Sequence, residues 1–362
     1  MNFDNILRND EKSVYNMRAL FEQYGYKQFR MSKFEEYDVY VQNKDFLVSD
    51  SIITFTGEGG KLMTLKPDVT FSIIKNTDDN SDAVTKLYYN ENVYRTTKTS
   101  RDFKEIMQTG LECIGNIDTY NICEVLTLAA QSLALTGENY ILDVSHMGFI
   151  SAMLCHLDVA PDMQSAVLDC IREKNAHGIY ALLGDKGECI VKMINAYGDF
   201  DTVISKLSEI NVNEDTNAVI SELTDIKNAL SNTEYYNNIH LDFSVVNDLN
   251  YYNGIVFQGF IAEVPAMVLS GGQYDKLMKK MGKASKAIGF AVYHDMLKQL
   301  NQSAQQYDAD VLITYSSDAD LAKLGAKVRE LTGSGMTVTV QRNIPKNLKY
   351  KLHMDFDKEG IQ

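Results

Sequence analysis

The apolar positions near the start of the chain repeat with helical spacing and then change to strand-like alternation. The helical spacing predicts an amphipathic helix over 9–25. Phe29, Met31 and Phe34 then alternate as in a strand. Short apolar runs on both sides of the glycine-rich stretch 57–60 predict a β-hairpin, because glycine permits the backbone conformations of a tight turn.

The chain continues this mixture of strands and helices as far as about residue 300. Further strands are predicted at 85–89, 92–94, 106–114, 140–144, 240–243, 255–262 and 266–270. Further helices are predicted at 70–75, 122–135, 275–281 and 288–300. The first of these follows Pro67 and Asp68, since proline and an acidic residue favour a helix start.

The stretch 147–238 differs from its surroundings, because Leu, Ile, Ala and charged residues recur in it at helical spacing. It predicts a helical insertion between two groups of strands. The strands on both sides of it predict an α+β fold, with a mainly antiparallel sheet and helices on one face. A concave ligand site is expected on the exposed face of that sheet.

The C-terminal part has its own pattern after a polar stretch at 302–306. A strand, a helix and a second strand are predicted between 311 and 341, with a further strand near 350–354. This is one βαβ unit, short for a complete doubly wound domain. We therefore expect a core over 1–301 and a truncated βαβ segment over 307–362.

Composition and charge restrict the possible partners. The chain has 362 residues and a net charge of −14, and no long basic stretch. Nucleic-acid binding depends on cations that displace counterions, so we expect no nucleic-acid partner. No secretory signal and no apolar run of roughly 20 residues occurs, so we expect a cytoplasmic protein that does not bind membranes. The scattered cysteines suit a reducing compartment: Cys113, Cys123, Cys155, Cys170 and Cys189.

The sequence contains no recognisable motif for binding a metal or a cofactor, and we expect neither. The six histidines form no HxxxH or HxxEH set. The glycines at 57–60 lead into a strand, whereas a dinucleotide site needs a glycine turn that opens a helix. A nucleophile elbow and a P-loop motif are also missing from the sequence.

Several segments, in the expected order along the chain, resemble motifs of the histidyl-tRNA synthetase family. Leu65-Lys-Pro-Asp68-Val-Thr70 is similar to a Leu-Arg-Pro-Glu/Asp-x-Thr segment of that family. Its aspartate version is particularly similar to a paralogue, the regulatory subunit of ATP phosphoribosyltransferase. The other matching segments are Arg95…Gln108-x-Gly110-x-Glu112, Tyr251-Tyr252-x-Gly254, Gly271-Gly-Gln-Tyr274-Asp275 and Gly289-Phe-Ala. Together they cover about residues 5–300 and imply a class II aminoacyl-tRNA synthetase-like fold.

The resemblance implies a histidine-binding site. Asp68, Thr70 and Gln108 would contact the ammonium group of histidine. Its imidazole would lie among Glu112, Tyr252 and Tyr274, and Tyr251 and Arg95 complete the predicted ligand set. Carboxylates and phenols suit an ammonium group and an imidazole as hydrogen-bond partners. Taken singly, a Glu, Gln or Tyr on a strand is more often a structural hydrogen-bonding residue, so the prediction depends on the ordered set.

Three positions depart from the synthetase pattern. Thr97 stands where a glutamate helps to seat ATP, and Asn247 and Met296 stand where arginines are expected. A triphosphate is bound and activated through such cations, and a thioether cannot replace a guanidinium. The pattern therefore predicts a protein that binds histidine without activating it, and no catalytic residue.

By resemblance, the chain would be a non-catalytic regulatory subunit of ATP phosphoribosyltransferase, the enzyme of the first step of histidine biosynthesis. It would form a homodimer through the core and a hetero-octamer with a separate short catalytic subunit. Histidine would be the effector of feedback control. An active histidyl-tRNA synthetase and a stand-alone synthetase-like histidine sensor are the alternatives.

Overall fold

The computed structural model describes residues 7, 9–41, 52–79, 83–96, 102–247, 249, 251–297, 307–358 and 360–361. The chain divides into two compact units, residues 1–300 and residues 301–362. No described helix is both long and apolar enough to span a bilayer.

A nine-stranded sheet forms the centre of the first unit. Its strands lie in the order β1 (Lys27–Gln28), β5 (Thr85–Thr96), β6 (Phe103–Gly115), β12 (Lys286–Tyr293), β11 (Leu269–Gln273), β10 (Ile255–Ile261), β7 (Tyr140–His146), β9 (Ile239–Asp242) and β8 (Tyr197–Gly198). Only the β1–β5 and β7–β9 pairs of these strands are parallel. The mainly antiparallel sheet agrees with the predicted fold class.

One face of this sheet is covered by α1 (Asn9–Gln23) and α4 (Thr119–Ala134). The α4 helix begins at a capping box, in which the Asp118 side chain accepts a hydrogen bond from the backbone N–H of Asn121. Phe21 of α1 packs edge-on against Phe290 of β12, with 6.0 Å between the ring centroids. These contacts bury a continuous apolar layer and leave the other face of the sheet for a site.

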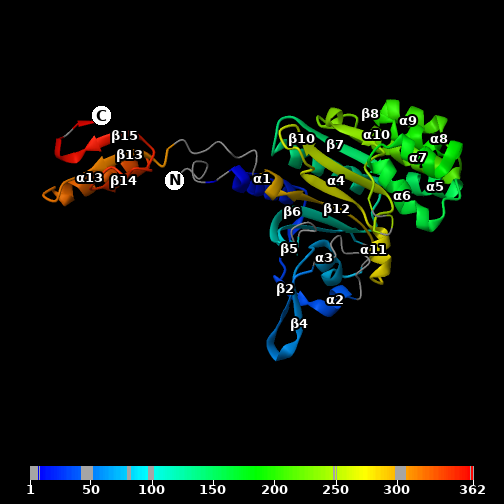
Figure 1. Ribbon diagram of the computed structural model, residues 1–362, viewed down its shortest axis with the longest axis horizontal. Coiled ribbons are helices and arrows are strands. Elements are labelled where there is room, and N and C mark those ends of the chain that lie inside the picture. The colour runs from blue at the N-terminus through cyan, green and yellow to red at the C-terminus, as the bar shows by residue number, and fades with distance from the viewer. Residues whose placement is uncertain are drawn as a thin grey trace. The chain divides into compact units, whose positions relative to one another are not determined.

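Six helices make up the insertion between β7 and β9. They are α5 (Met147–His156), α6 (Pro161–Arg172), α7 (Ala176–Leu183), α8 (Glu188–Ile194), α9 (Phe200–Glu209) and α10 (Glu214–Leu230), with 3-10 turns η4 (Gly184–Gly187) and η5 (Tyr236–Asn238). Figure 1 shows the helices grouped at the β7–β9 end of the sheet. The α10 helix packs against α4 and α5, which joins the insertion to the main apolar core.

A small three-stranded sheet, here called the arm, projects from the other end of the first unit (Figure 1). It consists of β2 (Phe34–Glu36), β4 (Leu62–Leu65) and β3 (Thr54–Thr56). The helix α2 (Tyr37–Val41) packs against β2 and β4, and α3 (Thr70–Asn76) follows β4 along the chain. A 3-10 turn, η3 (Glu58–Gly60), closes the β3–β4 hairpin where the glycines predict it. Asp68 Oδ1 accepts from the backbone N–H of Phe71 at 2.9 Å, which helps to start α3.

The predicted helix over 288–300 is wrong. Residues 286–293 form β12, and only the short α12 (His294–Leu297) follows it among the described residues; the helix α11 (Asp275–Lys280) precedes it. Ile288, Ala291 and Val292 have helical spacing, but they lie on β12, whose backbone pairs with β11 on one side and with β6 on the other instead of forming a helix. The strand entering a loop that was predicted from Phe29, Met31 and Phe34 is only partly found, because β1 ends at residue 28, residues 29–33 belong to no strand and β2 begins at Phe34. The strands predicted at 85–89 and 92–94 are one strand.

The second unit contains a four-stranded sheet in the order β14 (Val338–Gln341), β13 (Ala309–Thr314), β15 (Tyr350–Asp355) and β16 (Gly360–Ile361). The central β13 is parallel to β14 and β15. The helix α13 (Leu321–Gly333) connects β13 to β14, and η6 (Phe356–Lys358) precedes β16. The small core of the second unit comprises Val311, Ile313, Leu324, Leu331 and Met354.

Candidate functional site

A cavity of about 190 Å³ lies on the face of the main sheet that α4 leaves uncovered. Side chains alternate between the two faces of a strand. On β10, the Gly259 Cα faces α4, since a Cβ there would lie 2.7 Å from Leu133, whereas the neighbouring Gln258 lines the cavity. All eight residues of the predicted ligand set line this cavity: Asp68, Thr70, Arg95, Gln108, Glu112, Tyr251, Tyr252 and Tyr274.

Glu112 on β6 is the central acidic group of the cavity, and only 2% of its surface is exposed. Thr70 donates a hydrogen bond to its Oε1 at 2.6 Å, and the Tyr274 hydroxyl donates to its Oε2. Burial raises the pKa of Glu112 to about 8, the charge of Asp68 adds to the increase, and the Thr70 and Tyr274 hydrogen bonds oppose it. A cationic ligand would favour the ionised carboxylate, so the site is suited to an ammonium group or a protonated ring nitrogen.

Two glycines make room for this carboxylate and for its neighbours. Gly289 lies directly opposite Glu112 in the sheet. A Cβ at Gly289 would lie 1.8 Å from Glu112 Oε2 and 2.4 Å from the carbonyl oxygen of Leu111. A Cβ at Gly110 would lie 2.3 Å from the carbonyl oxygen of Phe290. The glycines of these motifs therefore serve close packing in the floor of the cavity.

Asp68 and Arg95 form the second charged group of the site. Arg95 Nε donates to the carbonyl oxygen of Pro67 at 2.8 Å, and its Nη2 lies 3.6 Å from Asp68 Oδ2. Arg95 is the one basic side chain among the described residues that line the cavity. The described lining therefore carries two acidic groups, Asp68 and Glu112, and one basic group, Arg95.

Tyrosines form one wall of the cavity. The ring centroids of Tyr251 and Tyr252 are 4.5 Å apart, and those of Tyr251 and Tyr274 are 6.0 Å apart. Burial raises the pKa of all three hydroxyl groups above the usual range, so the phenols are neutral. Neutral phenols can both donate and accept hydrogen bonds, as an imidazole with two different ring nitrogens requires.

The turn that carries Tyr251 and Tyr252 is held by side-chain hydrogen bonds. Asn253 Nδ2 donates to Asp275 Oδ2 at 3.1 Å, and the backbone N–H of Asp275 donates to Asn253 Oδ1 at 3.0 Å. Gln273 Oε1 accepts from the backbone N–H of Ile255 at 2.7 Å. The glycine that follows Asn253 must lack a Cβ, since one would lie 2.0 Å from Gln273 Oε1.

Sequence reasoning missed several lining residues: Tyr89, Gln258, Met267, Ser270, Ala291 and Tyr293. Ser270 Oγ and the Tyr293 hydroxyl are 2.8 Å apart and share a hydrogen bond. Ser270 is paired with Gln258 on one side and with Ala291 on the other. Strand alternation in the sequence indicates which residues share a face, but the lateral pairing of strands is not readable from it.

The departures from the synthetase pattern have different positions. Asn247 lines the cavity, so this position offers an amide where the pattern has a guanidinium. Met296 lies on α12, is 36% exposed and is not among the lining residues. Thr97 lies outside the described residues.

Comparisons with known proteins agree with these motifs. A family model described as histidyl-tRNA synthetase matches residues 6–297. The ATP phosphoribosyltransferase regulatory subunit of Oceanobacillus iheyensis is 27% identical over 331 residues, which are 88% of this chain and 81% of the relative. The protein of the same name from Bacillus thuringiensis is 24% identical over 320 residues, 84% of this chain and 76% of the relative.

Solved structures share the fold. An ATP phosphoribosyltransferase regulatory subunit/histidyl-tRNA synthetase from Bacillus halodurans gives a TM-score of 0.73 at 20% identity, over 92% of this chain and 88% of that chain. A chain of the ATP phosphoribosyl transferase (HisG:HisZ) complex from Thermotoga maritima gives 0.61 at 18% identity, over 81% of this chain and 97% of that chain. Since the family model spans most of the sequence, this chain belongs to the histidyl-tRNA synthetase family, and its curated relatives are named ATP phosphoribosyltransferase regulatory subunits.

Proposed function

We propose that this chain is a non-catalytic regulatory subunit of ATP phosphoribosyltransferase and that it binds histidine in the cavity. The observation that carries the proposal is the cavity lining, in which buried Glu112 accepts hydrogen bonds from Thr70 and Tyr274 while Arg95 is the one described basic residue. The names of the curated relatives support the same function.

Histidine suits this lining group by group. Its ammonium group would be bound by Asp68, Thr70 and Gln108, in charge-assisted hydrogen bonds worth about 1.5–3 kcal/mol. Its imidazole would lie against Glu112 and the tyrosine wall, where carboxylate and phenol oxygens satisfy the two ring nitrogens. Arg95 would be the partner of the ligand carboxylate.

ATP suits the lining poorly. Nucleotide activation depends on cations that stabilise the charge developing on phosphate oxygens. In the lining, Asn247 replaces one guanidinium group of the synthetase pattern, and Met296, which is exposed and does not line the cavity, replaces another. This supports a role in binding an amino acid without adenylating it.

The regulation would operate in an assembly. We propose a homodimer of this chain through the core that joins a separate short catalytic subunit, in a hetero-octamer, in the cytoplasm. Histidine bound in the cavity would shift the population of catalytic conformations, and such couplings are typically about 1–3 kcal/mol.

The test combines purified chains. Turnover of the short catalytic subunit from the same organism is measured alone, with this chain, and with this chain plus histidine. We expect activation by this chain and inhibition by histidine, with the inhibition weakened by Glu112→Gln. Unchanged turnover and unchanged histidine sensitivity on mixing would contradict the proposal.

The family match also supports a second candidate, an active histidyl-tRNA synthetase. Histidine-dependent exchange of pyrophosphate into ATP discriminates between the two, since only a synthetase catalyses it. Calorimetric titration is expected to give heat with histidine and none with ATP. A stand-alone histidine sensor would bind histidine but would not retain the phosphoribosyltransferase in a pull-down from the native cell.

A further inference from the structure

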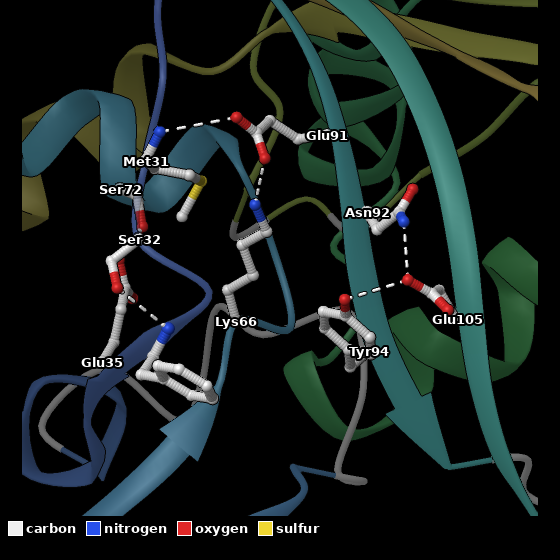
Figure 2. A network of polar contacts seen from close by, with 10 residues as sticks. Met31, Ser32, Glu35, Lys66, Ser72, Glu91, Asn92, Tyr94 and Glu105 are labelled. Atoms are coloured by element: carbon white, nitrogen blue, oxygen red, sulfur yellow. Dashed lines mark hydrogen bonds and ion pairs between the residues drawn. The ribbon is translucent and has the colours of Figure 1, made fainter.

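A buried ion pair lies beside the histidine site but outside the cavity. Lys66 is 0% exposed, and its Nζ forms an ion pair with Glu91 Oε2 on β5. The other carboxylate oxygen, Glu91 Oε1, accepts from the backbone N–H of Met31 at 3.5 Å. Figure 2 shows Glu91 between these two nitrogens, one from the chain before the arm and one from the chain after it.

The backbone of Lys66 also forms hydrogen bonds with the chain before the arm and with β5. Lys66 N donates to the carbonyl oxygen of Lys33 at 3.1 Å, and Lys66 O accepts from Tyr94 N at 2.9 Å. The next residue, Pro67, accepts from Arg95 Nε. These contacts tie the chain at 66–67 to β5 immediately before it reaches the cavity.

What the segment carries into the cavity gives the ion pair its significance. Asp68 and Thr70 follow Lys66 by two and four residues, and both line the cavity. Thr70 must lie within hydrogen-bond distance of Glu112, where it is now at 2.6 Å. Thr70 is the first residue of α3, and Asp68 accepts a hydrogen bond from the backbone N–H of Phe71, so a displacement of residues 66–70 would move the start of this helix and separate Thr70 from Glu112.

A lysine with no exposed surface is rare, because burial of an unpaired charge is strongly unfavourable. Removing one partner of a buried pair leaves the other charge uncompensated, and the structure around it rearranges or takes in water. Around Lys66, such a rearrangement would first displace residues 66–70, which include Asp68 and Thr70 of the proposed ammonium site. An apolar side chain at position 66 would avoid burying a positive charge. It could not form the ion pair with Glu91, which also accepts a hydrogen bond from Met31.

We propose that Lys66 and Glu91 are positioning residues that hold Asp68 and Thr70 in the geometry required for histidine. The inference rests on the proposed histidine binding. Neither residue lines the cavity, so neither touches the ligand. The pair acts by placing the segment 66–70 against β5, and it connects this segment to the chain at Met31.

A second buried ion pair in the same unit provides a matched control. Lys86, also on β5, pairs with Glu124 of α4 at 2.6 Å, and the side chains are 23% and 4% exposed. Its ammonium group also lies 5.4 Å from the centre of the Tyr26 ring. Neither residue of this control pair lines the cavity, and the polar contacts of Lys86 are with Glu124, the Tyr26 ring and the carbonyl oxygen of Tyr24.

The experiment measures histidine affinity by calorimetry and thermal unfolding in the full chain and its variants. Lys66→Met should weaken histidine binding at least roughly tenfold and Glu91→Gln about threefold, while Lys66→Arg should stay within about threefold of the wild type. Lys86→Met should lower the unfolding temperature but leave histidine affinity within about twofold.

The outcomes separate the two proposals. A wild-type chain that binds no histidine refutes the proposed function, whereas a wild type that binds, with Lys66→Met and Glu91→Gln binding equally well, refutes the positioning role alone. Equal loss of affinity in Lys86→Met also refutes it, because general destabilisation would then be sufficient. If Lys66→Met does not fold, Glu91→Gln decides the matter, and wild-type histidine affinity in that variant overturns the inference.

Discussion

The two ends of the cavity differ in charge and in the way their side chains are held. At the carboxylate end, formed by Asp68, Thr70, Glu112 and Tyr274, an acid receives hydrogen bonds on both of its oxygens. At the neutral end, formed by Gln258, Met267, Ser270, Ala291 and Tyr293, every side chain is uncharged. The two ends adjoin on the central strands β6 and β12, where the Glu112–Gly289 pair lies next to the Gly110–Ala291 pair.

This difference indicates which kind of ligand group each end can take. A buried acceptor that is already oriented loses little conformational freedom on binding a cation. An anion at the neutral end would lose its hydration without gaining a charged partner, which is unfavourable in a partly buried site. This distribution of charge supports the proposal that the cavity binds the cationic and ring portions of an amino acid, and the residues of the neutral end offer no charged partner for phosphate.

The largest effect is expected for Gly289→Ala, which places a new Cβ against the carboxylate end. The new Cβ would lie 1.8 Å from Glu112 Oε2 and 2.4 Å from the Leu111 carbonyl oxygen, so the carboxylate and the strand must shift. We expect a loss of stability of about 1–3 kcal/mol and a loss of histidine affinity of more than roughly a hundredfold, measured by denaturant unfolding and calorimetry.

The control is another glycine to alanine change. Gly333 ends α13 in the second unit, and a Cβ there would meet nothing within 4 Å. Gly333→Ala should leave histidine binding unchanged. Wild-type histidine affinity in Gly289→Ala would show that Glu112 need not occupy its present place.

The second effect concerns the charge of Glu112 rather than its position. Glu112→Gln keeps the shape of the side chain but removes the carboxylate. A charge-assisted hydrogen bond worth about 1.5–3 kcal/mol would be lost, so histidine affinity should fall roughly ten- to a hundredfold in calorimetry. Binding as tight as in the wild type would mean that the ligand does not depend on the carboxylate end.

The same residue should make stability depend on pH. Its folded-state pKa is raised to about 8, whereas an unfolded glutamate titrates near 4.3, so between these values the folded chain binds more protons. Stability should therefore fall as the pH rises from about 4.5 to 8, by up to about 1.4 kcal/mol per pH unit. Glu112→Gln should lack this contribution, and the difference between the two unfolding temperatures should change with pH. Parallel pH profiles would exclude the raised pKa.

The sequence predicted the carboxylate end much better than the neutral end, for a physical reason. Asp68, Thr70, Glu112 and Tyr274 belong to motifs whose order along the chain indicates convergence, and all of them line the cavity. Their assignment to histidine stays a prediction. Ser270 and Tyr293 meet only because β11 pairs with β12, and strand pairing is a long-range property.

The error at 288–300 has the same origin. Gly289 is small because Glu112 lies over it, and this interruption gave the strand an apparent helical spacing. The complete burial of Lys66 could not be foreseen either, since lysine side chains usually lie at the surface. The fold class was predicted correctly, because it depends on the order of the elements rather than on single contacts.

A moderate effect is expected for Arg95→Lys. The lysine keeps the positive charge but lacks the planar guanidinium that donates to the Pro67 carbonyl oxygen and lies near Asp68 at the same time. We expect histidine affinity to fall by roughly three- to tenfold, measured by calorimetry. Arg95→Met should fall further, and equal affinities for the two variants would show that charge at this position is irrelevant.

The smallest effect is expected for Ser270→Ala, which changes only the neutral end. It removes the partner of the Tyr293 hydroxyl, now at 2.8 Å, but the hydroxyl lines the cavity and can bond to water instead. Histidine affinity should change by less than about threefold. If Ser270→Ala weakened binding as much as Glu112→Gln, the ligand would lie across both ends, and the contrast between them would no longer identify the bound group.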